Sequence, residues 1–597
     1  MSPGRPRGVA FFAQGARVVA ATLLATSSVL LQAANLSVQI DGVEGELKDA
    51  ALAASDLAPY VDREVTPAQA RRLYTRAPAK ISAALEAYGF YHAAVSGELK
   101  ETPKGPSVTL HVELGEPTGV AALELIVPEP ARDEEAVRKA MAAFVPKKGE
   151  RFNHGLYEKS KAAVQTALLA SGYLDSRLVT HTVEVSRAEN RATIRLEWDP
   201  GARYRYGPTT FSGGQFGEGF LDRYVPWHEG DFYDQAQMLQ LQQKLIDADY
   251  FAVVEVQPDT EHAGNGIVPI AVALGPAKRD VYSAGLFVDT DVGVGVRGGW
   301  TRRWLNLSGH RLRVDAQLAQ RLRSATATYS IPLPGENNRS FNFGASYLYE
   351  NTDTTQSNNR SLAANETRQW MGFTRTLGLR LLDGTFTILD PHGNEAIEEH
   401  GSSTLLYPEV VLERKRADDP LFVHDGYSIL FTVRGSLDQW SSTQFVQARA
   451  DGKWIHAFGS SQRIIVRGSV GAMKVGDFDQ LPPDLRFFAG GDRSIRGYAY
   501  QAIGPQNANG LIIGGEDLLV GSTEYEYYFT HDWGMAVFVD AGDAFTGFAN
   551  FRTRIGSGLG LRWRSPVGMV RADIGVPVHD PDGNTGVELH LVIGPDL

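Results

Sequence analysis

The chain has 597 residues, too many for one compact domain, so several folding units are expected. Its formal net charge of -12 at pH 7 offers no general attraction to nucleic acid, which is therefore not expected as a partner. The chain contains no cysteine, which excludes disulfide bonds, thiolate metal sites and cysteine nucleophiles.

The N-terminus has the pattern of a secretory signal peptide. Three arginines precede or begin an uncharged, mostly apolar stretch from Val18 to Ala34, which ends in small residues suited to cleavage. We expect residues 1–34 to be the signal peptide, and a short membrane anchor is the alternative. No later stretch approaches the roughly 20 apolar residues that a membrane-spanning helix needs. A mature protein that crosses a membrane must therefore do so as a closed barrel.

Three segments in the first half of the chain share one sequence pattern: Leu85 to Ala94, Leu168 to Leu178 and Leu245 to Val254. In each, a leucine lies five residues before an aromatic residue at the end of a helical pattern, and a strand-like run comes after it. The aromatic residues are 83 and 77 residues apart, which indicates small α/β domains. The expected domains are residues 35–117, 118–202 and 203–279.

The second of these units shows the order of its elements most clearly. Strand patterns at Val120 to Val127, Arg177 to Val185 and Ala192 to Trp198 surround two helical patterns, which gives the order β-α-α-β-β. This order, with Gly149-Glu150-Arg151-Phe152 and Gly230-Asp231-Phe232-Tyr233 ahead of the second helices, resembles the polypeptide-transport-associated (POTRA) domain. The alternative is three generic α/β modules that only tether the C-terminal half of the chain.

The first unit departs somewhat from this pattern. Pro78 lies inside its second helical pattern. Because proline removes a backbone hydrogen bond and crowds the preceding turn, it should kink or break that helix.

From about residue 280 the sequence alternates polar and apolar residues, as in Arg311 to Leu318. A soluble sandwich would show the same alternation, but seven of the nine Trp lie in this region, as the interfacial girdles of a membrane barrel require. At roughly 20 residues per strand and connection, this region holds about 16 strands. The fold class expected is therefore α+β POTRA repeats followed by an all-β transmembrane barrel of antiparallel strands at residues 280–597. Val281 to Asp289 and Gly586 to Ile593 are expected to close it as first and last strands.

One segment narrows the function. Residues 486–498 read Arg-Phe-Phe-Ala-Gly-Gly-Asp-Arg-Ser-Ile-Arg-Gly-Tyr, which is similar to the loop signature of the BamA/TamA superfamily of outer-membrane assembly proteins and two-partner secretion transporters. The resemblance continues through Gly514 to Glu516, Gly521 to Tyr525, Phe538 to Gly542 and Gly558 to Asp573. With the POTRA-like units it covers nearly the whole mature chain.

The core of this signature, Arg496-Gly497-Tyr498, is expected on a loop that folds back into a polar lumen. A guanidinium can bind a carboxylate through two parallel hydrogen bonds, and glycine lets the loop approach the wall closely. Strand parity turns Asp540 and Asp573 inward. Asp540 is the first candidate partner of Arg496, with Asp573 and Glu524 behind it. Such a contact can stabilise the barrel, gate it, or do both.

Within the superfamily, three POTRA units and the ending Ile593 to Leu597 are most similar to the TamA branch. This resemblance implies a protein of the outer membrane, with POTRA domains in the periplasm, that assists the assembly of autotransporters and other barrel proteins. It implies a TamB-like periplasm-spanning partner, unfolded client proteins and contact with outer-membrane lipid. No cofactor, metal ion or enzymatic activity is expected. Clients could add at a lateral seam between first and last strands, where Gly285 and Gly594 would weaken regular pairing.

Two other classes of function remain as alternatives. One is a secretion pore that passes polypeptide through the lumen, as two-partner transporters do. The other is an outer-membrane enzyme, for which the chain offers neither a G-x-S-x-G elbow nor an H-E-x-x-H pair. The acidic turns Asp289 to Asp291 and Asp580 to Gly583 lack calcium-ligand spacing and are expected to be solvated loops. The polar segment Asn351 to Asn365 is expected to be an extended external loop.

Overall fold

The computed structural model describes residues 34–334, 339–390, 393–566 and 568–594. Residues 1–33 of the expected signal peptide lie outside these ranges. The chain divides into two compact units, the first ending at Arg203 and the second beginning at Tyr204. No helix within the described ranges is long and apolar enough to cross a membrane.

The first domain of unit one packs two helices on a small mixed sheet of order β2-β5-β4. Its elements are β1 (Ala34–Asn35), β2 (Ser37–Asp41), α1 (Gly45–Ala54), β3 (Glu64–Val65), α2 (Pro67–Glu86), β4 (Ala94–Thr102) and β5 (Gly105–Glu113). The expected break at Pro78 does not occur, since α2 runs through it. Ala77, Ile81 and Leu85 are buried in the core on either side, so packing offsets the backbone hydrogen bond that proline removes.

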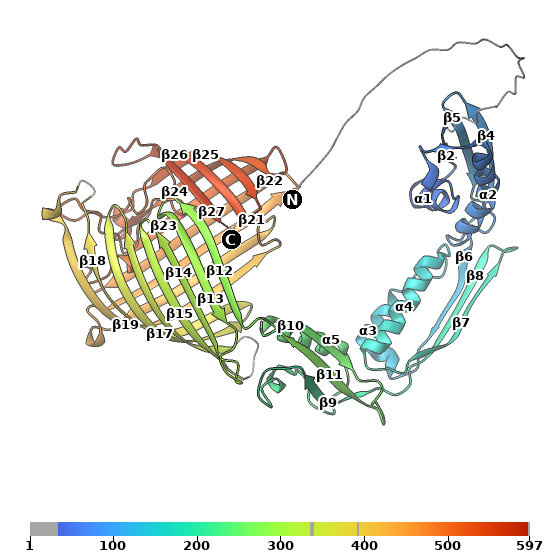
Figure 1. Ribbon diagram of the computed structural model, residues 1–597, viewed down its shortest axis with the longest axis horizontal. Helices are drawn as coiled ribbons and strands as arrows, with labels where there is room; N and C mark the ends of the chain where they lie inside the picture. The colour runs from blue at the N-terminus through green and yellow to red at the C-terminus, as the bar shows by residue number, and fades with distance from the viewer. Residues whose placement is uncertain (1–33, 335–338, 391–392, 567, 595–597) are drawn as a thin grey trace, which may run out of the picture. The chain divides into compact units, whose positions relative to one another are not determined.

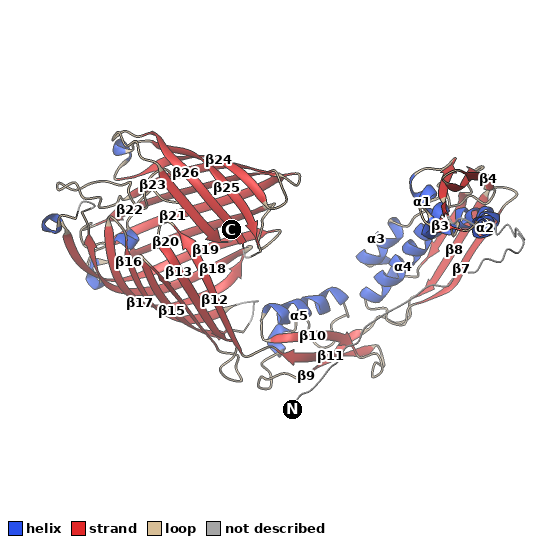
Figure 2. Ribbon diagram, turned by 45° about the horizontal axis from the view of Figure 1, so that its top comes forward, coloured by secondary structure: helices blue, strands red, loops and turns tan. Residues whose placement is uncertain are grey.

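The second domain has the order β-α-α-β-β that the sequence predicted. Its elements are β6 (Gly119–Ile126), α3 (Glu135–Ala142), α4 (His154–Ala170), β7 (Arg177–Ser186) and β8 (Arg191–Asp199). Helices α3 and α4 lie against one face of the sheet β6-β8-β7 (Figure 2), where Val137, Val164 and Ile194 share one core. Tyr173 of the repeated sequence pattern is buried in that core, which explains why an aromatic residue recurs where the helix ends.

The third domain belongs to the second unit and has a sheet of order β10-β11-β9. Its elements are β9 (Arg205–Ser212), α5 (Gln235–Asp247), β10 (Phe251–Pro258) and β11 (Ile267–Pro276). A short 3-10 turn, Asp222–Tyr224, precedes α5 where the second domain has its first helix. Residues 213–226 contain several glycines and Pro226, and both residue types disfavour a helix.

The third domain is joined to the barrel by an aromatic contact. The Tyr250 hydroxyl donates a hydrogen bond to the Gly309 carbonyl at 2.6 Å, and Phe216 packs its ring against Tyr250 and Trp304. The Gly217 N–H donates to the Leu307 carbonyl at 3.1 Å. The turn at residues 303–310 is therefore held by the domain that precedes the barrel.

We expect Gly309→Ala to loosen this joint. Gly309 has φ +71°, and a Cβ there would lie 2.4 Å from the Phe220 ring. The strained backbone and the clash together should cost roughly 1–3 kcal/mol of local stability. Hydrogen exchange of residues 303–310 and 216–224 should accelerate, while exchange in the remaining barrel hairpins should match that of the unaltered protein. Unchanged exchange in the joint would contradict this expectation.

Sixteen strands in the described residues form one closed antiparallel barrel, which confirms the expected strand number (Figure 1). Its strands are β12 (Asp280–Asp289), β13 (Gly293–Arg302), β14 (Arg311–Ala319), β15 (Leu322–Pro332), β16 (Ser340–Asn351), β17 (Thr355–Trp370), β18 (Phe373–Ile388), β19 (Glu399–Ala417), β20 (Gly426–Ser436), β21 (Phe445–Phe458), β22 (Gln462–Val475), β23 (Asp517–Tyr528), β24 (Trp533–Phe545), β25 (Arg554–Ser565), β26 (Gly568–His579) and β27 (Glu588–Gly594).

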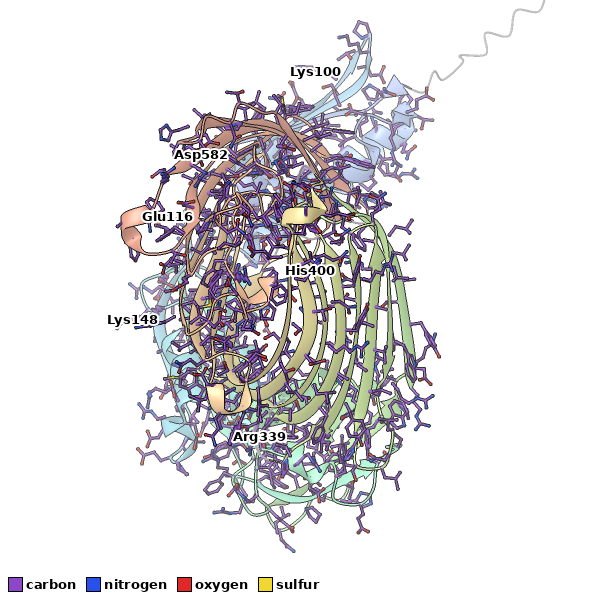
Figure 3. The ribbon with its side chains drawn as sticks, turned by 90° about the vertical axis from the view of Figure 1, so that its left-hand side faces the viewer. Lys100, Glu116, Lys148, Arg339, His400 and Asp582 are labelled. Carbon is purple, nitrogen blue, oxygen red and sulfur yellow. The ribbon has the colours of Figure 1, made fainter. Side chains whose placement is uncertain are left out.

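Figure 3 draws the side chains along the strands of the barrel wall. On β24, Val537 is 45% exposed on the outer face, whereas its neighbour Phe538 is 1% exposed on the inner face. Asp540 is buried on the same inner face. The period-two alternation thus separates an apolar exterior from an interior that holds charged groups.

The expectation of an external loop at Asn351 to Asn365 is wrong. Strand β16 ends at Asn351 and β17 begins at Thr355. The polar side chains of β17 bond to those of β16, since the hydroxyls of Ser346 and Ser361 lie 2.7 Å apart. Polar composition there reflects an inner wall that faces a polar lumen, where it does not oppose strand formation.

Candidate functional site in the barrel lumen

Residues 476–516 connect β22 to β23 and form the segment that we call the lumen loop. Its side chains Leu485, Phe487 and Ile495 are buried in one apolar cluster with inward-facing wall residues such as Tyr407 and Phe445. Burial of this apolar surface docks the loop against the inner wall and brings its charged residues to fixed places.

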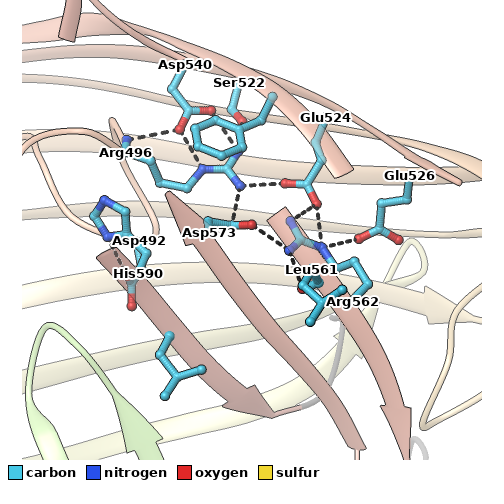
Figure 4. Close-up of polar contacts among 12 residues, drawn as sticks. Asp492, Arg496, Ser522, Glu524, Glu526, Asp540, Leu561, Arg562, Asp573 and His590 are labelled. Atoms are coloured by element: carbon cyan, nitrogen blue, oxygen red, sulfur yellow. Dashed lines mark hydrogen bonds and ion pairs between the residues drawn. The ribbon is translucent and has the colours of Figure 1, made fainter. Parts of the chain in front are cut away.

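Arg496 of the lumen loop lies among three wall carboxylates (Figure 4). Its Nε and Nη2 donate to the two carboxylate oxygens of Asp540 at 2.8 and 3.0 Å. Its Nη1 donates to Glu524 at 2.6 Å and to Asp573 at 3.0 Å. The structure therefore brings Arg496 together with all three carboxylates that the sequence named.

The surroundings of Arg496 keep it charged. The side chain is 4% exposed, and its guanidinium lies 3.5 Å from the centre of the Phe538 ring. Burial alone would lower the pKa of Arg496, but the hydrogen bond to Asp540 and the charges of Glu524, Asp540 and Asp573 raise it above its ordinary value. The loop is thus held by charge-assisted hydrogen bonds in a buried site.

The wall carries a second buried arginine that sequence reasoning missed. Arg562 of β25 donates to Glu524 at 2.6 Å, to Glu526 at 2.8 Å and to Asp573 at 2.5 Å. The connected ion pairs of the described residues thus join four arginines to four carboxylates, namely Arg463, Arg467, Arg496, Arg562, Glu524, Glu526, Asp540 and Asp573. We call this set the charge network. The alternation of β25 could have revealed Arg562. Its neighbours Leu561 and Trp563 lie on the apolar outer face, so Arg562 must point into the barrel.

The two residues after Arg496 fix the loop beside the last strands. Gly497 has φ +94°, and a Cβ there would lie within 3.0 Å of backbone atoms of Val576, so only glycine fits. Its N–H donates to Nε2 of His590 at 3.0 Å. The buried Tyr498 donates its hydroxyl to the His579 carbonyl at 3.2 Å.

The barrel closes between β12 and β27. One register pair, Asp289 with Val592, joins the described parts of these strands. The register pairs of the other neighbouring strands number from seven between β26 and β27 to sixteen between β17 and β18. Gly285 pairs with Arg297 on β13, and Gly594 pairs with Met569 on β26, so both glycines named from the sequence lie outside the closing pair.

The turn after β12 is not the solvated loop that the sequence suggested. Asp291 is buried, and its carboxylate accepts the Asp492 N–H at 3.2 Å. Burial, with the neighbouring charges of Asp492 and Asp289, raises the pKa of Asp291 to about 8. The lumen loop covers this turn, and that long-range contact is invisible in the local composition.

This raised pKa predicts a pH effect. Because the folded state holds the Asp291 proton up to about pH 8 and the unfolded chain releases it near pH 4, stability should fall as pH rises across that window. Asp291→Asn should flatten the slope and stabilise the turn above pH 8. Urea unfolding of the detergent-solubilised protein between pH 5 and 9 would measure it. A slope unchanged by the substitution would assign the pH dependence to other groups.

The fold and site define a transmembrane β-barrel of the outer membrane, with POTRA domains in the periplasm and an arginine-anchored loop inside. Residues 306–596 match the Omp85 superfamily domain, and residues 37–114 match POTRA domain TamA domain 1. The chain belongs to the Omp85 superfamily, a non-enzymatic family, and carries a TamA-type first POTRA domain.

Two known proteins illustrate the likeness. The chain is 36% identical over 107 residues to the outer membrane protein assembly factor BamA of Nitratidesulfovibrio vulgaris, a match that spans 17% of this chain and 14% of that protein. BamA from Haemophilus ducreyi lacking POTRA domains 1–3 has a similar fold, with a TM-score of 0.67 at 16% identity. That likeness covers 80% of this chain and 99% of the other.

Proposed function

We propose that this protein is an assembly factor that inserts β-strands of autotransporters and other barrel proteins into the outer membrane through the seam between β12 and β27. The observation that carries the proposal is the closing contact itself, one register pair within the described strands. A seam with so few backbone hydrogen bonds costs little to open compared with any other pair of neighbouring strands.

Opening the seam would expose two unpaired strand edges in the membrane. Such edges are templates for an added strand, because their N–H and C=O groups have no water to bond to in hydrocarbon. On the outer face next to the seam, Leu286 of β12 and Leu589 of β27 are exposed. An added client strand would therefore meet lipid with its apolar side chains while pairing its backbone with the barrel.

The proposed partners derive from the domain order. Unfolded outer-membrane or autotransporter proteins are the proposed clients, and outer-membrane lipid surrounds the barrel. The TamA-type first POTRA domain supports a TamB-like periplasm-spanning protein as a further partner.

A disulfide across the seam tests the proposal. The chain contains no cysteine, so Asp289→Cys with Val592→Cys places one defined pair at the closing register. The oxidised barrel should lose most of its assembly activity and recover it on reduction. A matched lock between β14 and β15, Gln317→Cys with Ser324→Cys, should leave activity unchanged. Full activity with the seam locked would contradict lateral opening.

The same lock separates this proposal from the secretion-pore alternative. A polypeptide that passes through the lumen does not need the seam, so a locked pore would keep its transport activity. It would instead need the lumen loop, whose apolar side chains are buried inside the barrel, to move aside.

A further inference from the structure

Three segments that are distant in sequence meet at the seam through hydrogen bonds of their side chains. Thr290, in the turn after β12, donates its hydroxyl to the Asp492 carboxylate of the lumen loop at 2.9 Å. The same carboxylate accepts a hydrogen bond from Nδ1 of His590 on β27 (Figure 4). Asp492 and His590 are buried. The turn, the loop and the last strand are therefore tied to one carboxylate, and we call Thr290, Asp492 and His590 the seam clasp.

The hydrogen bonds of His590 fix its tautomer. The backbone N–H of Gly497 can only donate, so Nε2 of His590 accepts and carries no proton. The ring proton is then on Nδ1, where it points at Asp492. The imidazole of His590 thus bonds through Nε2 to Gly497 and through Nδ1 to Asp492, which also accepts the hydrogen bond from Thr290.

These bonds argue against a bound cation. The ligand atoms of Asp291, Asp492 and His590 lie within 4.8 Å of one another, a spacing that suits a divalent metal ion. Ligation by His590 would require either Nδ1 to lose its bond to Asp492 or Nε2 to lose the bond from Gly497. The geometry is that of a hydrogen-bonded relay.

The clasp stands where backbone pairing is weakest. Beyond the single register pair, Thr290 donates its N–H to the Leu591 carbonyl, and the Leu591 N–H donates to the Thr290 hydroxyl, both at 3.2 Å. The Thr290 hydroxyl therefore bonds to the last strand and to the lumen loop at once. Side chains replace much of the ladder that closes the other strand pairs.

We propose that His590 is a positioning residue through which the docked lumen loop holds the β12–β27 seam closed. This inference rests on the proposed lateral opening and concerns what regulates it. Arg496 docks the loop. In the docked loop, Gly497 and Asp492 bond to His590 and hold the last strand against the first. When the loop leaves, His590 loses both partners, and the seam keeps only its short backbone contact and the bond from the Leu591 N–H to the Thr290 hydroxyl. A client strand that displaces β27 must break the same bonds.

Hydrogen exchange of the full-length protein in lipid nanodiscs tests the clasp without any assembly assay. His590→Phe keeps the ring and removes both hydrogen bonds, and Thr290→Val removes the hydroxyl at nearly constant volume. Each should speed exchange about tenfold in residues 286–293 and 588–594, and His590→Phe should also speed it in residues 486–498. Because both substitutions break the link through Asp492, their combined effect should be smaller than the sum of the two. His590→Gln, whose amide offers an NH2 group as donor and a carbonyl oxygen as acceptor, should restore part of the protection.

A histidine away from the seam provides the control. His456→Phe on β21 removes a strand histidine paired with Asp425 away from the seam, and should leave seam exchange unchanged. Faster exchange confined to residues 588–594 in His590→Phe would reduce His590 to a local stabiliser of β27 and overturn the proposal. Loss of seam protection on adding EDTA to the unaltered protein would replace the relay by a metal ion. Failure of lateral opening would appear only as an active locked barrel, so the two proposals fail separately.

Discussion

Replacing Arg496 with alanine should release the lumen loop and abolish most assembly activity while the barrel stays folded. The substitution leaves Asp540, Glu524 and Asp573 short of one positive charge in a buried site. Removing one partner of a buried ion pair costs about 3–5 kcal/mol, and the loop can escape that cost by undocking. Protease sensitivity of residues 486–498 and the amount of heat-modifiable folded barrel would measure the two parts of this expectation.

Two further substitutions serve as controls for Arg496→Ala. Arg496→Lys keeps the charge but not the planar donors that reach three carboxylates. Its assembly activity and the protease sensitivity of its loop should therefore lie between those of Arg496→Ala and those of the unaltered protein. Arg313→Ala removes an arginine that is 63% exposed and paired with Asp315, and should change stability by less than about 1 kcal/mol. If folded barrel falls in step with activity in Arg496→Ala, the contact serves the barrel's stability alone.

The parts of the fold that depend on local periodicity could be read from the sequence. Alternation in β24 placed Asp540 inward because a strand's side chains have period two, and the structure puts it there. The strand number came instead from the length of the region, at roughly 20 residues per strand and connection. Composition misled for Asn351 to Asn365, where polar residues on the inner wall of β17 looked like a loop. A polar segment can be a loop, or a strand whose inner face lines a polar lumen. Composition alone does not distinguish the two.

The remaining parts depend on contacts between distant segments. Arg562 was overlooked because its partners lie on β23 and β26 and reach it only when strands β23 to β26 pair side by side. His590 has no local feature that distinguishes it from the other histidines, and its importance comes from Asp492 and Gly497, more than 90 residues away. Long-range polar contacts of this kind are not encoded in a repeat or a motif.

Arg562→Gln should have the largest effect on the barrel itself. Arg562 is fully buried in the wall and is shared by Glu524, Glu526 and Asp573, so its loss leaves excess negative charge on strands that cannot undock as a loop can. We expect about 3–5 kcal/mol of destabilisation and a lower temperature for the heat-modified gel shift. Arg302→Gln, which removes a partly exposed pair with Asp280, should cost less than about 1 kcal/mol.

The cause of this effect can be separated from the loss of packing by restoring the charge balance. Glu526 contacts both Arg562 and Arg463, so Arg562→Gln combined with Glu526→Gln again leaves equal numbers of positive and negative groups in the charge network. Because an uncompensated buried charge costs more than a missing pair, the double variant should recover about half of the lost stability. If it is as unstable as Arg562→Gln alone, the shape and hydrogen bonds of the guanidinium, and not its charge, hold β23, β25 and β26 together.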